Sequence, residues 1–85
     1  MFTLNLDILN IDLPPGKDQQ QLVEIAEKEI KELIKSGDLY GKDLKLNGRL
    51  TTGMALMLGH ALAHICKSVA VFDPKMNDYV VCIKH

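Results

Sequence analysis

Two strand-like apolar segments that flank one apolar helical segment are the feature that most restricts the fold of this chain. Leu44 and Leu46 mark the first strand, the helical segment covers about residues 52–66, and the second strand is Val69–Phe72. A crossover of about 15 residues between two strands gives a parallel, right-handed βαβ unit. The sequence therefore predicts an α/β fold with this unit at its centre.

The residues after this unit predict a returning strand. Asp73 and Pro74 begin a turn, and Tyr79–Ile83 follows as an antiparallel strand. The continuous apolar run Val69–Phe72 is typical of a central strand that is covered on both faces. We expect a small mixed β-sheet with helices, in which a Rossmann-like βαβ core is followed by an antiparallel hairpin strand.

The first 37 residues predict one further strand and one long helix. Apolar side chains alternate with polar ones, as in a strand with one buried face, at Phe2, Leu4, Leu6 and Ile8. Pro14 and Pro15 end this strand because proline cannot donate a hydrogen bond to a sheet. A helix with one apolar side follows at about residues 18–36, and Gly37 supplies a left-handed cap.

The whole chain, residues 1–85, has the size of one small domain. Its content of 47% hydrophobic and 25% charged residues is that of a folded globular protein. The formal charge of −1 argues against a broad basic surface for nonspecific nucleic-acid binding. An anionic ligand would therefore need a local cluster of donor groups.

The sequence indicates a soluble, cytoplasmic protein that does not enter a membrane. Asn5 and Asp7 interrupt the N-terminal apolar segment, which therefore does not resemble a secretory signal. The longest apolar run, Met54–Cys66, is too short to span about 30 Å of bilayer. Cys66 and Cys82 lack a CxxC spacing and are expected to be buried, reduced thiols.

The second helix is apolar on nearly all sides. Besides three alanines, it carries Met54, Leu56, Met57, Leu58, Leu62 and Ile65. One sheet cannot cover such a helix completely. A side-by-side homodimer that packs this helix is the simplest way to bury it.

The loop between the first βαβ strand and this helix contains several groups that suit an anionic ligand: Asn47, Gly48, Arg49 and Thr51. Carboxyl ends of parallel strands and N-termini of helices commonly bind anions. Gly48 allows close approach of the backbone, Arg49 offers a planar fork for phosphate, and Thr51 adds a hydroxyl. Neither a Walker A motif nor GxGxxG is present, and the alternative is a glycine turn, a surface arginine and a helix cap.

Asp73 and Lys75 follow the second βαβ strand, at the same predicted edge of the sheet. An aspartate before proline is commonly part of a turn, which is the structural interpretation. Its position beside the Arg49 loop favours a functional carboxylate, and Lys75 adds a second cation. Both interpretations remain open at this point.

His60 and His64 are four residues apart, a spacing that suits two ligands of a transition metal on one helix face. Ala61 stands where the zincin HExxH motif needs glutamate, which excludes that metalloprotease motif. Two histidines are an incomplete metal site, so further ligands would have to come from elsewhere. The structural alternatives are a satisfied core or interface histidine at His60, and a His64 that stabilises the C-terminal end of the helix.

The direction of the helix predicts where His64 and Asp73 lie. The helix starts near the carboxyl edge of the sheet, and Thr52 to His64 spans roughly 18 Å at about 1.5 Å per residue. His64 is therefore expected at the amino edge, whereas Asp73 follows the return strand at the carboxyl edge. A reaction that used both groups would need two copies of the chain that meet end to end.

Three motifs in this order resemble the third CRISPR-associated ring nuclease family, a compact relative of the CRISPR-associated Rossmann-fold domains. They are GR at Gly48 and Arg49, HxxxH at residues 60–64, and VAVxDP at residues 69–74. The match covers the last half of the chain and, more loosely, its first strand. Members of the family usually continue with another strand and a polar tail beyond the position of His85.

This resemblance implies a metal-dependent ring nuclease. Such proteins bind cyclic tetra-adenylate, the second messenger of type III CRISPR defence, between two dimers. With manganese as cofactor they cleave it to linear di-adenylate, which switches the response off. The implied assembly is a homodimer that stacks end to end into a tetramer or a filament.

The resemblance also implies roles for individual residues. His64 and Asp73 correspond to the catalytic pair, contributed by opposing dimers, and the ribose 2′-OH is the expected nucleophile. His64 would act as general acid and base, and Asp73 would hold metal or orient the hydroxyl. His60, His64 and Asp73 are the candidate metal ligands. The groups expected to bind the ring are Asn47, Gly48, Arg49, Thr51 and Lys75.

Two other functions compete with the nuclease. One is a non-catalytic module that binds cyclic oligoadenylate or a short RNA and forms dimers or tetramers. The other is a purely structural dimer domain without a ligand.

Overall fold

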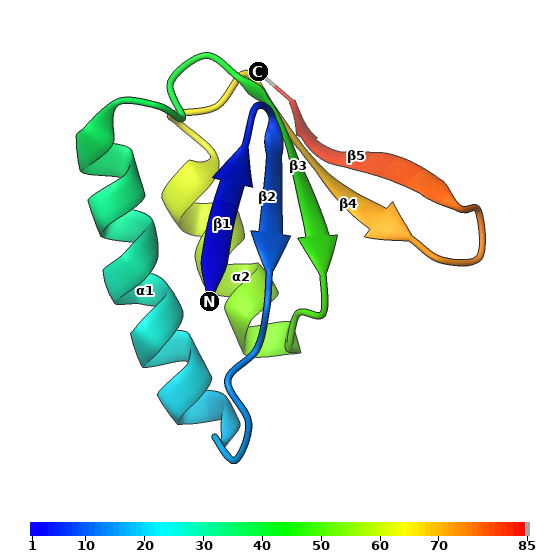
Figure 1. Cartoon of the computed structure of the whole chain (residues 1–85). Helices are drawn as coiled ribbons and strands as arrows, with labels where there is room; N and C mark the ends of the chain where they lie inside the picture. Colours follow the sequence, from blue (N-terminus) through cyan, green and yellow to red (C-terminus); the bar gives the residue numbers. More distant parts are fainter. Residues whose placement is uncertain (85) are drawn as a thin grey trace.

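A five-stranded sheet forms one layer of the protein, shown as a computed structural model that describes residues 1–84 (Figure 1). The strands lie in chain order across the sheet: β1 (Phe2–Asn5), β2 (Ile8–Ile11), β3 (Asp43–Gly48), β4 (Ser68–Asp73) and β5 (Asp78–Lys84). Strands β2, β3 and β4 are parallel, whereas β1 and β5 run antiparallel to their neighbours. The predicted mixed sheet with a Rossmann-like core is confirmed.

Two helices form the second layer, α1 (Gln19–Ser36) between β2 and β3 and α2 (Thr52–Leu62) between β3 and β4. In Figure 1, α2 lies behind the sheet and α1 lies to its left, and both helices pack into one core on the same face of the sheet. This arrangement leaves the opposite face of the sheet without a helical cover. Neither helix is long and apolar enough to cross a membrane.

The hydrophobic core lies between the sheet and the two helices. The sheet contributes Leu9, Ile11, Leu44, Leu46 and Val69, all at most 7% exposed. Each helix contributes one buried row at a spacing of four residues: Leu22, Ala26 and Ile30 from α1, and Met54, Leu58 and Leu62 from α2. This spacing places the apolar side chains of each helix on one face, and burial of each large one stabilises the fold by roughly 2 kcal/mol.

Local signals in the sequence explain where the helices begin and end. The Asp18 carboxylate accepts from the Gln21 backbone N–H, and the Gln21 side chain accepts from the Asp18 backbone N–H, which completes a capping box. Gly37 ends α1 with a φ of 83°, as predicted. The Thr51 hydroxyl accepts from the Met54 N–H and caps α2.

The prediction of a single N-terminal strand is wrong, because the segment is a hairpin. The chain reverses at Leu6 and Asp7, and β2 pairs with β1 so that Leu4 lies opposite Leu9. Leu6 has a φ of 58° and is 82% exposed, so it does not belong to the buried face. The turn lacks the glycine that usually marks a two-residue hairpin.

The predicted second helix is too long at its C-terminal end. It ends at Leu62 instead of residue 66, and Ala63 is its C-cap. The backbone N–H groups of Ile65 and Cys66 both donate to the Leu62 carbonyl, which closes a turn in place of further helix. The chain turns there because β4 must start beside β3, where the Ser68 N–H donates to the Lys42 carbonyl.

The prediction that β4 is covered on both faces is also wrong. Val69 and Ala70 are buried, but Val71 and Phe72 are only half-buried. The helices cover the side that carries Val69 and Val71, and within residues 1–84 β5 is the only strand beyond β4. The continuous apolar run of β4 therefore belongs to a strand that the helices cover on one face only.

Candidate functional site

The loop from Gly48 to Thr52 lies at the carboxyl edge of the sheet, as predicted. Gly48 has a φ of 123°, and an added Cβ would collide with the backbone carbonyl of Ile11 in the neighbouring strand. Only glycine suits this position. Arg49 follows it at the surface, exposed to solvent.

The N-terminus of α2 is already occupied by side chains of the protein. The Thr51 hydroxyl accepts from the Met54 N–H at 3.2 Å, and the Gln19 amide oxygen accepts from the Gly53 N–H at 2.8 Å. Two of the free backbone N–H groups that a helix start offers to an anion are therefore used. The structural role of Thr51 is directly visible, whereas Gln19 was not recognised in the sequence because it comes from the distant start of α1.

Asn47 lies apart from the other predicted ligand-binding groups. Leu46 is buried toward the helices, and alternation along β3 directs Asn47 to the opposite face of the sheet. There its amide donates to the Asn10 amide oxygen at 2.9 Å. Asn47 therefore belongs to the sheet surface and not to the loop before α2.

Asp73 and Lys75 lie at the same carboxyl edge as Arg49. Asp73 is the half-buried last residue of β4, and its carboxylate accepts from the Lys75 backbone N–H at 2.9 Å. This bond is the turn-forming role that an aspartate before proline commonly has. The pairing of β3 with β4 ends at Leu46 and Val71, and the two strands diverge beyond it (Figure 1).

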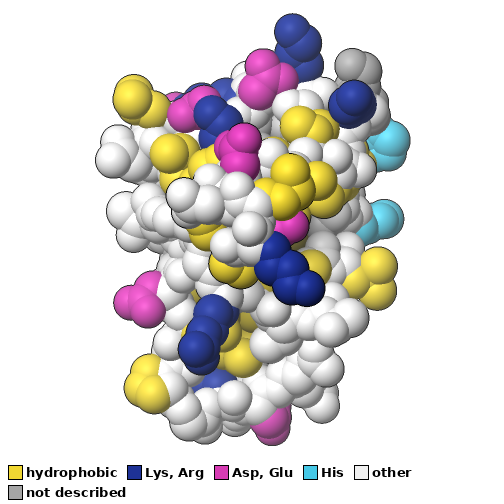
Figure 2. All heavy atoms as spheres, turned by 90° about the vertical axis from the view of Figure 1, so that its right-hand side faces the viewer, with side chains coloured by type: hydrophobic (Ala, Val, Ile, Leu, Met, Phe, Trp, Pro, Cys, Tyr) yellow, Lys and Arg dark blue, Asp and Glu magenta, His cyan; other side chains and the backbone are white. Residues whose placement is uncertain are grey.

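His60 and His64 lie at the other end of the subunit. His60 is in the last turn of α2, and His64 is in the turn that follows the helix, two residues after Leu62. Both are exposed, and Figure 2 shows the described histidine side chains at the same side of the surface. The expectation that both stand on one helix face is thus corrected, because the helix ends between them.

His64 and Asp73 stand at opposite ends of one copy. His64 precedes β4 and Asp73 is the last of its six residues. At about 3.3 Å per residue the strand alone separates them by roughly 16 Å. The geometry predicted from the helix direction is confirmed.

The candidate metal ligands do not meet within one copy. Among residues 1–84, no three histidine, cysteine, aspartate or glutamate side chains form a group that could hold a metal ion. His60 and His64 are at the amino edge, whereas Asp73 is at the carboxyl edge. A manganese site that uses all three would have to form between copies.

No known family model matches the sequence, and no curated protein or solved structure matches it either. A functional interpretation therefore depends on the motifs and on the geometry of this chain alone.

Proposed function

We propose that this chain is a ring nuclease that cleaves cyclic tetra-adenylate to linear di-adenylate at a site shared by two copies. The observation that carries the proposal is the position of His64 and Asp73 at opposite ends of β4. Because one copy cannot bring these two side chains together, they suit a ligand that is held between two copies. Loss of the cyclic messenger would end a type III CRISPR response.

End-to-end stacking would bring the carboxyl edge of one copy against the amino edge of the next. The first edge offers Asp73, the exposed Arg49 and the exposed Lys75, and the second offers His64. The two cations suit phosphates of the ring, with the arginine able to bind two oxygens at once.

The chemistry needs one proton acceptor and one proton donor. The ribose 2′-OH attacks the adjacent phosphorus, the bond from phosphorus to the 5′ oxygen breaks, and a 2′,3′-cyclic phosphate forms. A base removes the 2′-OH proton and an acid returns a proton to the leaving 5′ oxygen. Imidazole can do either, which suits His64, and Asp73 would orient the hydroxyl.

A manganese site belongs to this proposal only as a site formed between copies of the chain. The candidate ligands do not form a site in one copy, so we assign no step of the reaction to the metal. Dependence on added manganese is an outcome of the experiment below.

The direct test is product analysis after incubation with cyclic tetra-adenylate, with and without manganese. The proposal expects linear di-adenylate from the unmodified chain. Asp73→Asn should abolish product, because it removes the charge but keeps an oxygen that can accept the Lys75 N–H. Asp78→Asn is the matched control, because Asp78 lies opposite Asp73 on β5 and has no assigned role.

A binding module without catalysis is the second candidate. It is favoured by the hydrogen bond from the Lys75 N–H to Asp73, since that turn explains the aspartate without any reaction. This function predicts that cyclic tetra-adenylate or a short RNA is bound and recovered uncut. Asp73→Asn would then leave binding unchanged.

A further inference from the structure

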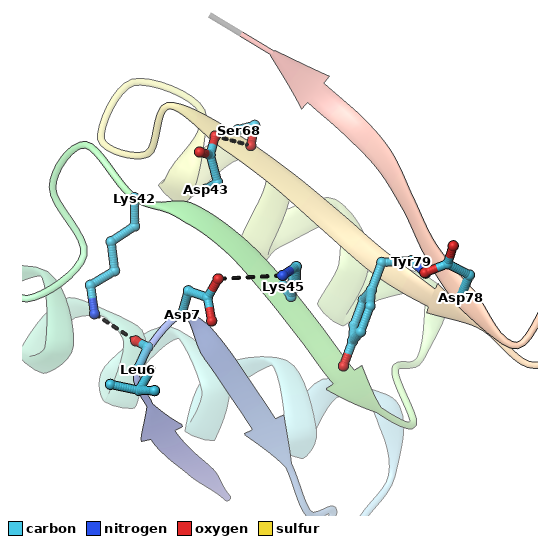
Figure 3. A network of polar contacts seen from close by, with 8 residues as sticks. All are labelled: Leu6, Asp7, Lys42, Asp43, Lys45, Ser68, Asp78 and Tyr79. Carbon is cyan, nitrogen blue, oxygen red and sulfur yellow. Dashed lines mark hydrogen bonds and ion pairs between the residues drawn. The ribbon is translucent and has the colours of Figure 1, made fainter.

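The face of the sheet away from the helices carries an aromatic pair. Phe72 of β4 lies opposite Tyr79 of β5, and their ring centroids are 5.4 Å apart at an interplanar angle of 72°. Both side chains are half-buried. On β3, the strand next to β4, the Lys45 ammonium lies 5.8 Å from the Tyr79 ring centroid. Figure 3 shows both side chains on this side of the sheet. We call this surface the open face.

Two side-chain amides continue the open face on β2 and β3. Asn47 donates to Asn10 at 2.9 Å, and within residues 1–84 neither side chain makes another hydrogen bond. Both N–H groups of Asn10 and the amide oxygen of Asn47 therefore stay available to a ligand. Such groups can pair with the polar edge of a nucleobase.

We propose that the open face binds nucleobases, with an adenine base stacked on the aromatic pair and its edge hydrogen-bonded to Asn10 and Asn47. Aromatic rings on the surface of a sheet stack bases of single-stranded nucleic acids, and this stacking tolerates any base. The choice of adenine rests on the proposed function, whereas the stacking follows from the face itself.

The position of the face fits a ligand whose phosphates bind at the carboxyl edge. β3 leads from Asn47 directly into Gly48 and Arg49, and β4 leads from Phe72 into Asp73. A base on the face and a phosphate at the edge therefore lie within one nucleotide's reach along the same strands. This places base recognition and the candidate chemistry on one continuous surface.

The composition of the face favours a nucleotide over a second copy of the chain. The centre of a protein interface is depleted of charged groups. Here Lys45 and two amides lie on β2 and β3, with Ile8 and Ala70 on either side of Lys45. Lys45 pairs with Asp7 at 3.4 Å, but both side chains are over a third exposed. Such an exposed pair contributes little, so Lys45 can exchange its partner for a phosphate.

The first test uses the unmodified full-length chain and linear tetra-adenylate RNA as the probe. The chain has two tyrosines, Tyr79 on the face and the 61% exposed Tyr40 after α1. On titration, ring current from a stacked base should shift the NMR resonances of Tyr79 and leave those of Tyr40 in place. RNA binding that leaves the Tyr79 resonances unshifted would overturn the proposal. Tyr79 resonances that shift with protein concentration in the absence of RNA would overturn it as well.

Variants provide a second, independent test. Tyr79→Leu keeps an apolar side chain without the ring and should weaken binding of the RNA by about five-fold or more. Tyr79→Phe and the control Tyr40→Leu should bind as the unmodified chain does. Equal binding by Tyr79→Leu overturns the inference even if cyclic tetra-adenylate is still cleaved. If cyclic tetra-adenylate is not cleaved but the Tyr79 resonances shift with RNA, the proposed function fails and base binding stands.

Discussion

Gly48 is the residue on which the loop at the carboxyl edge depends most directly. Its φ of 123° and its contact with the Ile11 backbone exclude a side chain. We expect Gly48→Ala to reduce the free energy of unfolding by about 2 kcal/mol or more, measured by urea denaturation. Gly16→Ala is the matched control, because Gly16 also has a positive φ of 75° but an added Cβ would meet nothing within 4 Å. Equal losses in both variants would contradict this role of Gly48.

The two cysteines differ in environment, contrary to the expectation that both are buried. Cys66 is buried and Cys82 is exposed. Burial raises the pKa of the Cys66 thiol, with a smaller opposing effect of Lys42. Its thiolate is therefore disfavoured in the folded protein.

This difference predicts selective labelling. A thiol reagent at mildly alkaline pH should modify Cys82 quickly and Cys66 only on unfolding, as mass spectrometry of peptides would show. Because the folded pKa of Cys66 is raised, its contribution to stability is complete below the ordinary thiol value and decreases as pH rises above it. Comparable labelling rates at native conditions would show that Cys66 is not protected.

Individual residues were predictable where the cause is local. Gly37 caps α1 as the sequence predicted, and Thr51 caps α2, which is the structural alternative to its predicted role in ligand binding. The hydrogen bonds of Asn47 and Gln19 were not predicted, because their partners, Asn10 and Gly53, lie more than thirty residues away in the sequence. No local signal identifies such contacts.

At the scale of elements, Gln19 connects the start of α1 to the start of α2. Its amide oxygen accepts the Gly53 N–H, which is one of the free backbone donors of α2. Gln19→Ala should cost about 1 kcal/mol in the free energy of unfolding, from loss of one hydrogen bond. Gln20→Ala is the control, since Gln20 makes only a long, exposed contact with Glu24. A Gln19 variant as stable as the control would show that the contact does not contribute.

The elements differ in how well the sequence defines them. The positions of the long helix α1 and of strands β3 to β5 agree with the segments predicted from the sequence. The N-terminal hairpin does not, since Leu6 and Ile8 continue the alternation of β1 across the turn and conceal it. The end of α2 depends on β4 pairing with β3, which is a tertiary effect that overrides the helical pattern.

At the scale of the whole molecule, α2 exposes an apolar patch. Leu56 is 78% exposed. Ala55 and Gly59 of the same helix line an apolar cavity of about 270 Å³ together with residues of β3, β4 and β5. A side-by-side dimer would cover this patch. Leu56→Lys should therefore shift sedimentation velocity toward a monomer, with Leu6→Lys as control, because Leu6 is as exposed but lies in the β1–β2 turn. Identical sedimentation of both variants would exclude α2 from the interface.

The whole-molecule arrangement was the part of the candidate site best predicted from sequence. The order strand, helix, strand alone places His64 and Asp73 at opposite edges, and the structure agrees. What the sequence did not predict is the open face, because that requires both helices to lie on one side of the sheet. Because strand β2 was not predicted, the βαβ unit formed by β2, α1 and β3 was not recognised, and neither was the placement of both helices on one face.

The most direct measurement mixes two inactive variants, His64→Ala and Asp73→Asn, and assays cleavage of cyclic tetra-adenylate. In a stack, the intact Asp73 of one variant meets the intact His64 of the other, so partial activity should return. A double variant that carries both changes in one chain should restore nothing when added to either single variant. If the two variants assemble together and the mixture stays as inactive as each alone, the site is not shared between copies.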